Sequence, residues 1–164
     1  MRSKFFYLTA ALALPIAIFL FLKFFGKNEF AVEPLYQQNI PPTGCPFTYE
    51  LPYAVPDSVL ALVGDGAALT LVAFPEGGET DETEKLFRRL SSLFAEDPVR
   101  FHNMVESTAG NDYDVLRKCV FFLSGDTTAA LIDHEGRIRG KYATASAEDA
   151  DRLIVELKII LRKF

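Results

Sequence analysis

The feature that most constrains this chain is an uncharged, apolar run near its beginning. Phe5 to Leu22 read FFYLTAALALPIAIFLFL, and these 18 residues carry no charged side chain. At about 1.5 Å per residue, a helix of that length nearly crosses a hydrocarbon core of roughly 30 Å. Lys23 can place its ammonium group at the interface while Phe24 and Phe25 complete the span. The run predicts one transmembrane helix that tolerates Pro15 near its middle.

A cleaved signal peptide is the alternative interpretation of this run. The apolar stretch exceeds the usual roughly 7 to 15 residues, and no small-residue cleavage site follows it. Arg2 and Lys4 precede the run, and so short a tail is the easier side to leave in the cytoplasm. We therefore expect a single-pass protein of the cell inner membrane, with its C-terminal domain on the periplasmic side.

The proline content divides the chain into an anchor at residues 1–26, a tether at residues 27–56 and a domain at residues 57–164. Proline fixes φ and lacks an N–H group, so the tether is expected to be extended or turned rather than helical. Its second half carries the aromatic residues Phe47, Tyr49 and Tyr53. These rings indicate that this half lies on a surface.

Within the domain, the apolar spacing alternates between strand and helix periods. Strand patterns cover residues 58–63, 69–74, 99–105, 129–133 and 137–142, the last two forming a hairpin. Helix patterns cover residues 81–95, 111–118 and 150–164, the last behind a capping pattern at Ser146–Asp149. This order predicts an α/β fold with a mixed sheet flanked by helices, and a thioredoxin-like layout satisfies it without long loops.

Charge and motif content exclude several functions. Residues 28–164 hold 13 basic and 22 acidic residues, whereas nucleic-acid binding needs a basic face. No spacing points to a Ser–His–Asp set or a paired-carboxylate site, and His102 and His134 have no partner at metal-ligand spacing. We expect a protein that is not an enzyme, has no small-molecule substrate and needs no cofactor.

The C-terminal part of the chain carries a resemblance. Ala130 to Tyr142 read ALIDHEGRIRGKY, and an acidic cap and an amphipathic helix follow. Together with the anchor, the Val55-Pro-Asp57 approach and a strand before the first helix, this stretch resembles the Sco/SenC family. These are membrane-anchored, thioredoxin-fold proteins that bind copper and assist assembly of cytochrome oxidase. The similarity is closest over about the last 40 residues.

The chain departs from this family at the copper site. The resemblance implies a CxxxC motif before the first helix and a distal histidine, but the loop from Pro75 to Thr80 reads PEGGET, and Gly125 stands near the histidine position. Copper prefers thiolate and imidazole ligands, and a thiol redox cycle needs a thiolate. We therefore expect neither a metal site nor a catalytic thiol there.

The two cysteines, Cys45 and Cys119, lie 74 positions apart and match no metal or redox spacing. If they form a structural disulfide, it would contribute about 4 kcal/mol in the chain-entropy model. Alternatively, Cys119 is a buried free thiol, because it precedes the apolar residues VFFL. Both alternatives remain open at the level of sequence.

Two functional hypotheses follow. In the first, the protein is a membrane-anchored accessory or assembly subunit of a respiratory membrane complex of the cytochrome oxidase type, without a copper or thiol site. Its candidate interaction residues are Pro15, Tyr49, Tyr53 and Ile159. In the second, it is a residual copper or thiol–disulfide redox protein that uses Cys45 and Cys119. The missing soft ligands favour the first hypothesis.

Overall fold

The computed structural model describes residues 13–21, 23, 31–42, 44–64, 67–75, 80–105 and 112–161. The chain divides into two compact units, Met1–Ala31 and Val32–Phe164. In the first unit, the described residues 13–21 are helical, and all of them are exposed.

The expected transmembrane helix is wrong for the described part of the chain. Among those residues, no helix has both the length and the apolar character needed to cross a membrane. Helical residues 13–21 rise by about 14 Å, roughly half of a hydrocarbon core. The remainder of the predicted span, including residues 5–12, lies outside the described residues. The predicted single-pass, inner-membrane, periplasmic location rested on this helix and is corrected with it.

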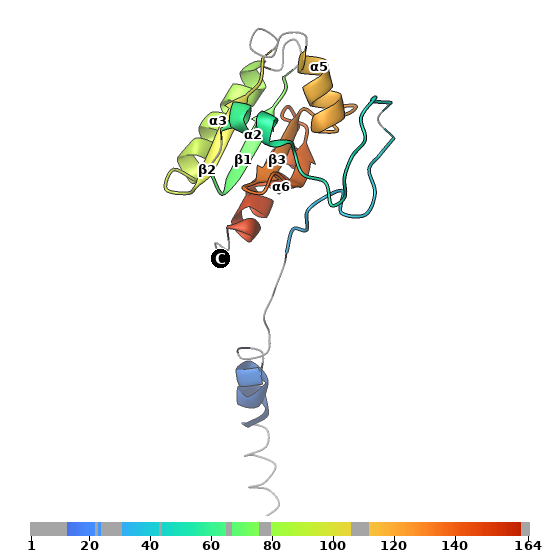
Figure 1. Cartoon of the computed structure of the whole chain (residues 1–164). Helices are drawn as coiled ribbons and strands as arrows, with labels where there is room; N and C mark the ends of the chain where they lie inside the picture. Colours follow the sequence, from blue (N-terminus) through green and yellow to red (C-terminus); the bar gives the residue numbers. More distant parts are fainter. Residues whose placement is uncertain are drawn as a thin grey trace, which may run out of the picture. The chain divides into compact units, whose positions relative to one another are not determined.

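The second unit is built on a four-stranded mixed sheet with the order β2-β1-β3-β4 (Figure 1). Its strands are β1 (Leu69–Ala73), β2 (Val99–Asn103), β3 (Ala129–Asp133) and β4 (Ile138–Tyr142). β2 runs parallel to β1, whereas β3 is antiparallel to both β1 and β4. The expected hairpin is therefore present as β3 and β4.

Helices cover both faces of this sheet. α3 (Thr80–Leu93) and α6 (Ala147–Ile160) pack on one face, and α2 (Asp57–Val63), α5 (Tyr113–Val115) and the π-helical turn η3 (Leu116–Val120) pack on the other. The strands sort their side chains by alternation, so Leu71 and Leu131 belong to the first face while Val72 and Ile132 belong to the second. Two apolar cores result, one on each side of the sheet.

The strand predicted at residues 58–63 is wrong, because this segment forms α2. Its buried residues are Val59 and Val63, which are four apart and so share one helix face. The helix starts after Pro56 and ends at Gly64, whose φ of 97° suits only glycine without strain. A short apolar run between such residues fits either structure locally, and packing on the sheet selects the helix.

The start of α6 agrees with the predicted cap. The Ser146 hydroxyl accepts a hydrogen bond from the Asp149 N–H at 3.3 Å. The Asp149 carboxylate accepts the Ala143 N–H at 2.7 Å, rather than that of Ser146 as a standard capping box would require. The second bond ties the helix start to the chain leaving β4.

Candidate docking site

The described residues between 32 and 56, called the strap here, belong to the second unit. At its first end the Leu35 N–H donates to the Ile138 carbonyl at 2.7 Å, and at its second end the Val55 N–H donates to Gly136 at 2.9 Å. Between these ends the Tyr53 N–H donates to Tyr36 at 3.1 Å, which closes the base of a loop. Figure 1 shows this loop reaching the side of α5 and returning to α2.

A disulfide bond joins the tip of this loop to the domain. It links Cys45 in the strap to Cys119 in η3, with the two Cα atoms 5.8 Å apart. Cys119 is 9% exposed and Cys45 is half-buried. The structure thus shows the disulfide rather than the free buried thiol that the sequence also allowed.

Two tyrosines of the strap add hydrogen bonds to the same region. The Tyr49 hydroxyl donates to the Cys119 carbonyl at 2.9 Å, and the Tyr53 hydroxyl donates to Val120 at 2.8 Å. Tyr53 is 5% exposed, so its ring is part of the core, whereas Tyr49 is half-buried. Burial, followed by the neighbouring Tyr49, raises the pKa of Tyr53 above its ordinary value, so its hydroxyl stays a donor.

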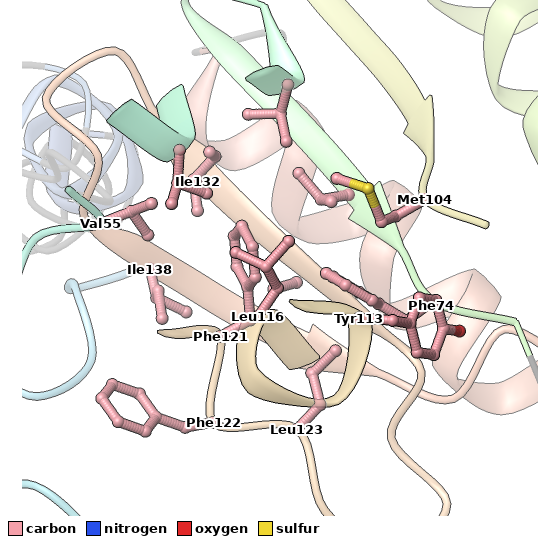
Figure 2. Close-up of a cluster of buried hydrophobic side chains, with 14 of the residues drawn as sticks. Val55, Phe74, Met104, Tyr113, Leu116, Phe121, Phe122, Leu123, Ile132 and Ile138 are labelled. Carbon is pink, nitrogen blue, oxygen red and sulfur yellow. The ribbon is translucent and has the colours of Figure 1, made fainter. Parts of the chain in front are cut away.

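Phe122 is the residue around which the strap packs. Its ring centroid lies 4.8 Å from that of Tyr36, 5.3 Å from Tyr49 and 4.7 Å from Tyr53, each edge to face. Figure 2 shows Phe121 directed into the core and Phe122 at the edge of the cluster. Phe122 has a φ of 52°, which is unfavourable for a side chain of this size. This turn directs consecutive rings to different partners.

Two pockets lie along the strap, each of about 390 Å³. The first, called the strap pocket here, is lined by residues that include Phe47, Tyr49, Pro52, Tyr53, Pro56 and Val120. Its single charged lining residue, within the described chain, is Glu50. The second is lined by residues that include Pro41, Pro42, Arg117, Phe122, Leu123 and Gly125. Cys119 lines the first pocket, and its neighbour Lys118 lines the second.

The strap also exposes large apolar side chains beside its pocket. Phe47 is 49% exposed and Leu51 is 48% exposed, and the Phe47 ring lies 6.4 Å from that of Tyr49. Exposed apolar residues beside a pocket are typical of protein-binding surfaces. Of the predicted interaction residues, Tyr49 and Tyr53 line the pocket.

The other predicted residues lie elsewhere. Pro15 is exposed in the helical residues of the first unit, and Ile159 is half-buried on α6. Neither lines the strap pocket. In the loop where the Sco/SenC resemblance would place a copper motif, residues 76–79 lie outside the described residues, while the Tyr113 hydroxyl donates to the Pro75 carbonyl at 3.0 Å. Within the described chain, no group of three or more His, Cys, Asp or Glu residues could hold a metal ion.

The two histidines lie in different surroundings. His102 is half-buried in the edge strand β2, where burial and then the nearby Arg100 lower its pKa below the ordinary value. His134 is exposed in the turn between β3 and β4, 3.6 Å from the Glu135 carboxylate. Neither lines the strap pocket.

No protein-family model matches this chain, and no curated protein matches it. The Sco/SenC resemblance therefore stays a prediction. The predicted role in cytochrome oxidase assembly and the respiratory chain has no support from these comparisons and is not carried further.

Proposed function

We propose that this protein is a non-catalytic accessory or assembly subunit that binds a partner protein at the strap pocket. The observation that carries the proposal is the combination of exposed Phe47 and Leu51 with a pocket whose walls are joined by a disulfide and two tyrosine hydrogen bonds. A surface held rigid before binding loses little conformational entropy when a partner docks.

The partner chemistry follows from the pocket lining. Apart from Glu50, the described residues around the pocket are uncharged, and many are apolar or aromatic. An apolar partner side chain would fill the pocket, and a neighbouring Lys or Arg would face the Glu50 carboxylate. The acidic excess of residues 28–164 would also favour encounter with a basic segment. The proposed occupant is therefore an extended protein segment with an apolar residue next to Lys or Arg.

Short synthetic peptides test this proposal with the full chain. A peptide with a central Leu-Lys pair should bind more tightly than its Leu-Glu counterpart, as measured by fluorescence anisotropy. Phe47→Ser should weaken binding by about tenfold or more, as for loss of an aromatic contact residue. Val155→Ser is the matched control, because Val155 is 53% exposed on α6 and lies outside the pocket.

Charge reversal gives the sharper arm of this experiment. Glu50→Lys should reverse the preference, so that the Leu-Glu peptide binds better than the Leu-Lys peptide. Binding that Phe47→Ser and Glu50→Lys leave unchanged would contradict the proposal. Failure of both peptides to bind the parent chain would also contradict the proposal.

The second candidate function, a thiol–disulfide redox protein, has one supporting observation, which is that Cys45 and Cys119 pair. A redox catalyst would exchange this bond with substrate thiols, whereas an accessory subunit needs it only for its shape. Turnover of a dithiol substrate by catalytic amounts of the chain would favour the redox function.

A further inference from the structure

We propose that the Cys45–Cys119 disulfide controls the strap pocket: the pocket is assembled in the oxidised protein and lost when the bond is reduced. This inference rests on the proposed docking function, since it concerns regulation of the same site. The device consists of a loop whose two ends are held by the fold up to Ile40 and from Tyr49, and whose exposed tip between them is joined to the domain by one covalent bond.

The base of the loop persists without the disulfide. Leu35 and Val55 donate to carbonyls of the β3–β4 hairpin region, and Arg139 donates to the Val32 carbonyl. Tyr53 and Val55 are also buried in the core. Reduction removes none of these contacts, so both ends of the strap stay in place.

The tip has a different kind of attachment. Ile40 and Tyr49 pack against the core, whereas the described residues from 41 to 48, apart from Cys45, are exposed. Between these flanks, Cys45 is joined to η3 by its disulfide. Because the rest of this tip is exposed, breaking the bond lets the tip move away from η3, while Tyr49 keeps its contacts with Cys119 and Phe122. Phe47 would then leave the strap pocket, which it lines together with Cys119 and Val120.

The reduction step is an ordinary thiol–disulfide exchange with a dithiol reductant. A reductant thiolate attacks the sulfur of Cys45, which is half-buried, and the sulfur of the more buried Cys119 leaves as a thiolate that takes up a proton. The second reductant thiol then attacks the mixed disulfide and releases Cys45. Two electrons and two protons pass from the dithiol, which becomes a disulfide, to the two cysteines.

Amide hydrogen exchange of the full chain tests the release of the loop. On treatment with dithiothreitol, amides of residues 37–52 should exchange at least about tenfold faster and become the least protected part of the domain, while β1, β3 and α6 stay folded and lose only the protection that the lower global stability accounts for. The Cys45→Ser/Cys119→Ser variant should show the fast pattern with or without reductant. Unchanged exchange at residues 37–52, or loss of all protection throughout the domain, would overturn the inference, because the device requires a local opening.

Peptide binding under the same conditions separates the inference from the proposed function. The oxidised chain should bind the Leu-Lys peptide, and reduction should weaken this binding by about tenfold or more, since affinity scales with the competent fraction. Equal binding in both redox states would overturn the inference and leave the docking function in place. Faster exchange of the loop with no peptide binding in either state would overturn the docking function and support the opening alone.

Discussion

Tyr53 shows how one residue of the strap differs from its neighbours. It lies in a proline-rich, aromatic segment, yet its ring is 5% exposed and its hydroxyl donates to the Val120 carbonyl at 2.8 Å. Tyr49, four positions earlier, makes the same kind of bond to Cys119 but is half-buried. The depth of each ring, rather than the presence of its hydrogen bond, separates a core residue from a surface residue.

Tyr53→Phe tests this distinction. Removing the hydroxyl leaves the Val120 carbonyl without this donor, so the free energy of unfolding should fall by about 1–2 kcal/mol in urea titrations. Tyr49→Phe is the matched control. It should lower the free energy of unfolding by less, because at a half-buried ring water can donate to the carbonyl in place of the missing hydroxyl. An equal or larger loss for Tyr49→Phe would contradict the assignment of Tyr53 to the core.

His102 gives the domain a pH-dependent contribution to stability. Its pKa in the folded protein lies below the ordinary value of about 6.5 because burial, and then Arg100, disfavour the charged ring. Well above pH 6.5 the ring is neutral in both the folded and the unfolded protein, so this histidine does not change the stability there. As the pH falls through about 6.5, the unfolded chain binds the proton more readily, so stability decreases until the folded state is protonated too.

His102→Gln should therefore reduce the loss of stability between roughly pH 8 and pH 5. The measurement is the urea midpoint at several pH values, compared with the parent chain. His134→Gln, in the exposed turn, is the control position. If the free energy of unfolding of His102→Gln fell with pH as steeply as that of the parent chain, burial of His102 would not be the cause of the pH dependence.

At the level of elements, three buried threonines connect α3 to the sheet. The Thr144 hydroxyl lies 2.9 Å from those of both Thr83 and Thr128, and the Thr144 N–H donates to Thr128 at 3.0 Å. All three are at most 5% exposed. Thr83 belongs to α3, Thr128 precedes β3 and Thr144 follows β4. These hydrogen bonds hold α3 in place against the end of the β3–β4 hairpin.

Thr144→Val keeps the shape of the side chain but leaves the Thr83 hydroxyl without this partner. The unfolding free energy should fall by about 1–3 kcal/mol, measured by thermal or urea unfolding. Adding Thr83→Val removes the hydroxyl that was left without a partner. The double variant should therefore lose less unfolding free energy than the sum of the losses of the two single variants. Strict additivity would show that the two hydroxyls are not coupled.

At the level of the whole molecule, one covalent bond joins residues 74 positions apart. Closing so long a loop restricts the unfolded chain more than it restricts the folded one. The paired Cys45→Ser/Cys119→Ser variant should therefore lose about 4 kcal/mol of unfolding free energy in the chain-entropy model. Urea unfolding measures this loss, and the parent chain in reductant should match the variant. A loss below about 1 kcal/mol would mean that the strap is held by its other contacts.

The fold was predictable wherever the chain is locally periodic. The β3–β4 hairpin, β1, α3 and α6 match predicted segments because each buries one regular set of apolar residues against the sheet. α2 was predicted as a strand because its seven residues are too few to distinguish the helical period from the strand period. The predicted membrane helix is wrong for the described residues, among which no helix has the length and apolar character to cross a membrane.

The candidate site was predictable only as a set of residues. The sequence identified Cys45 with Cys119 as a possible disulfide or redox pair, and Tyr49 and Tyr53 as interaction residues, but it could not say which would be buried, bonded or exposed. Those outcomes depend on Cys119, Val120 and Phe122, which lie far along the chain and meet the strap only after the sheet has formed. Local sequence determined the strands and most helices because their contacts repeat at short range. The tertiary structure alone decided the strap and its pocket, because non-periodic contacts between distant residues have no local signature.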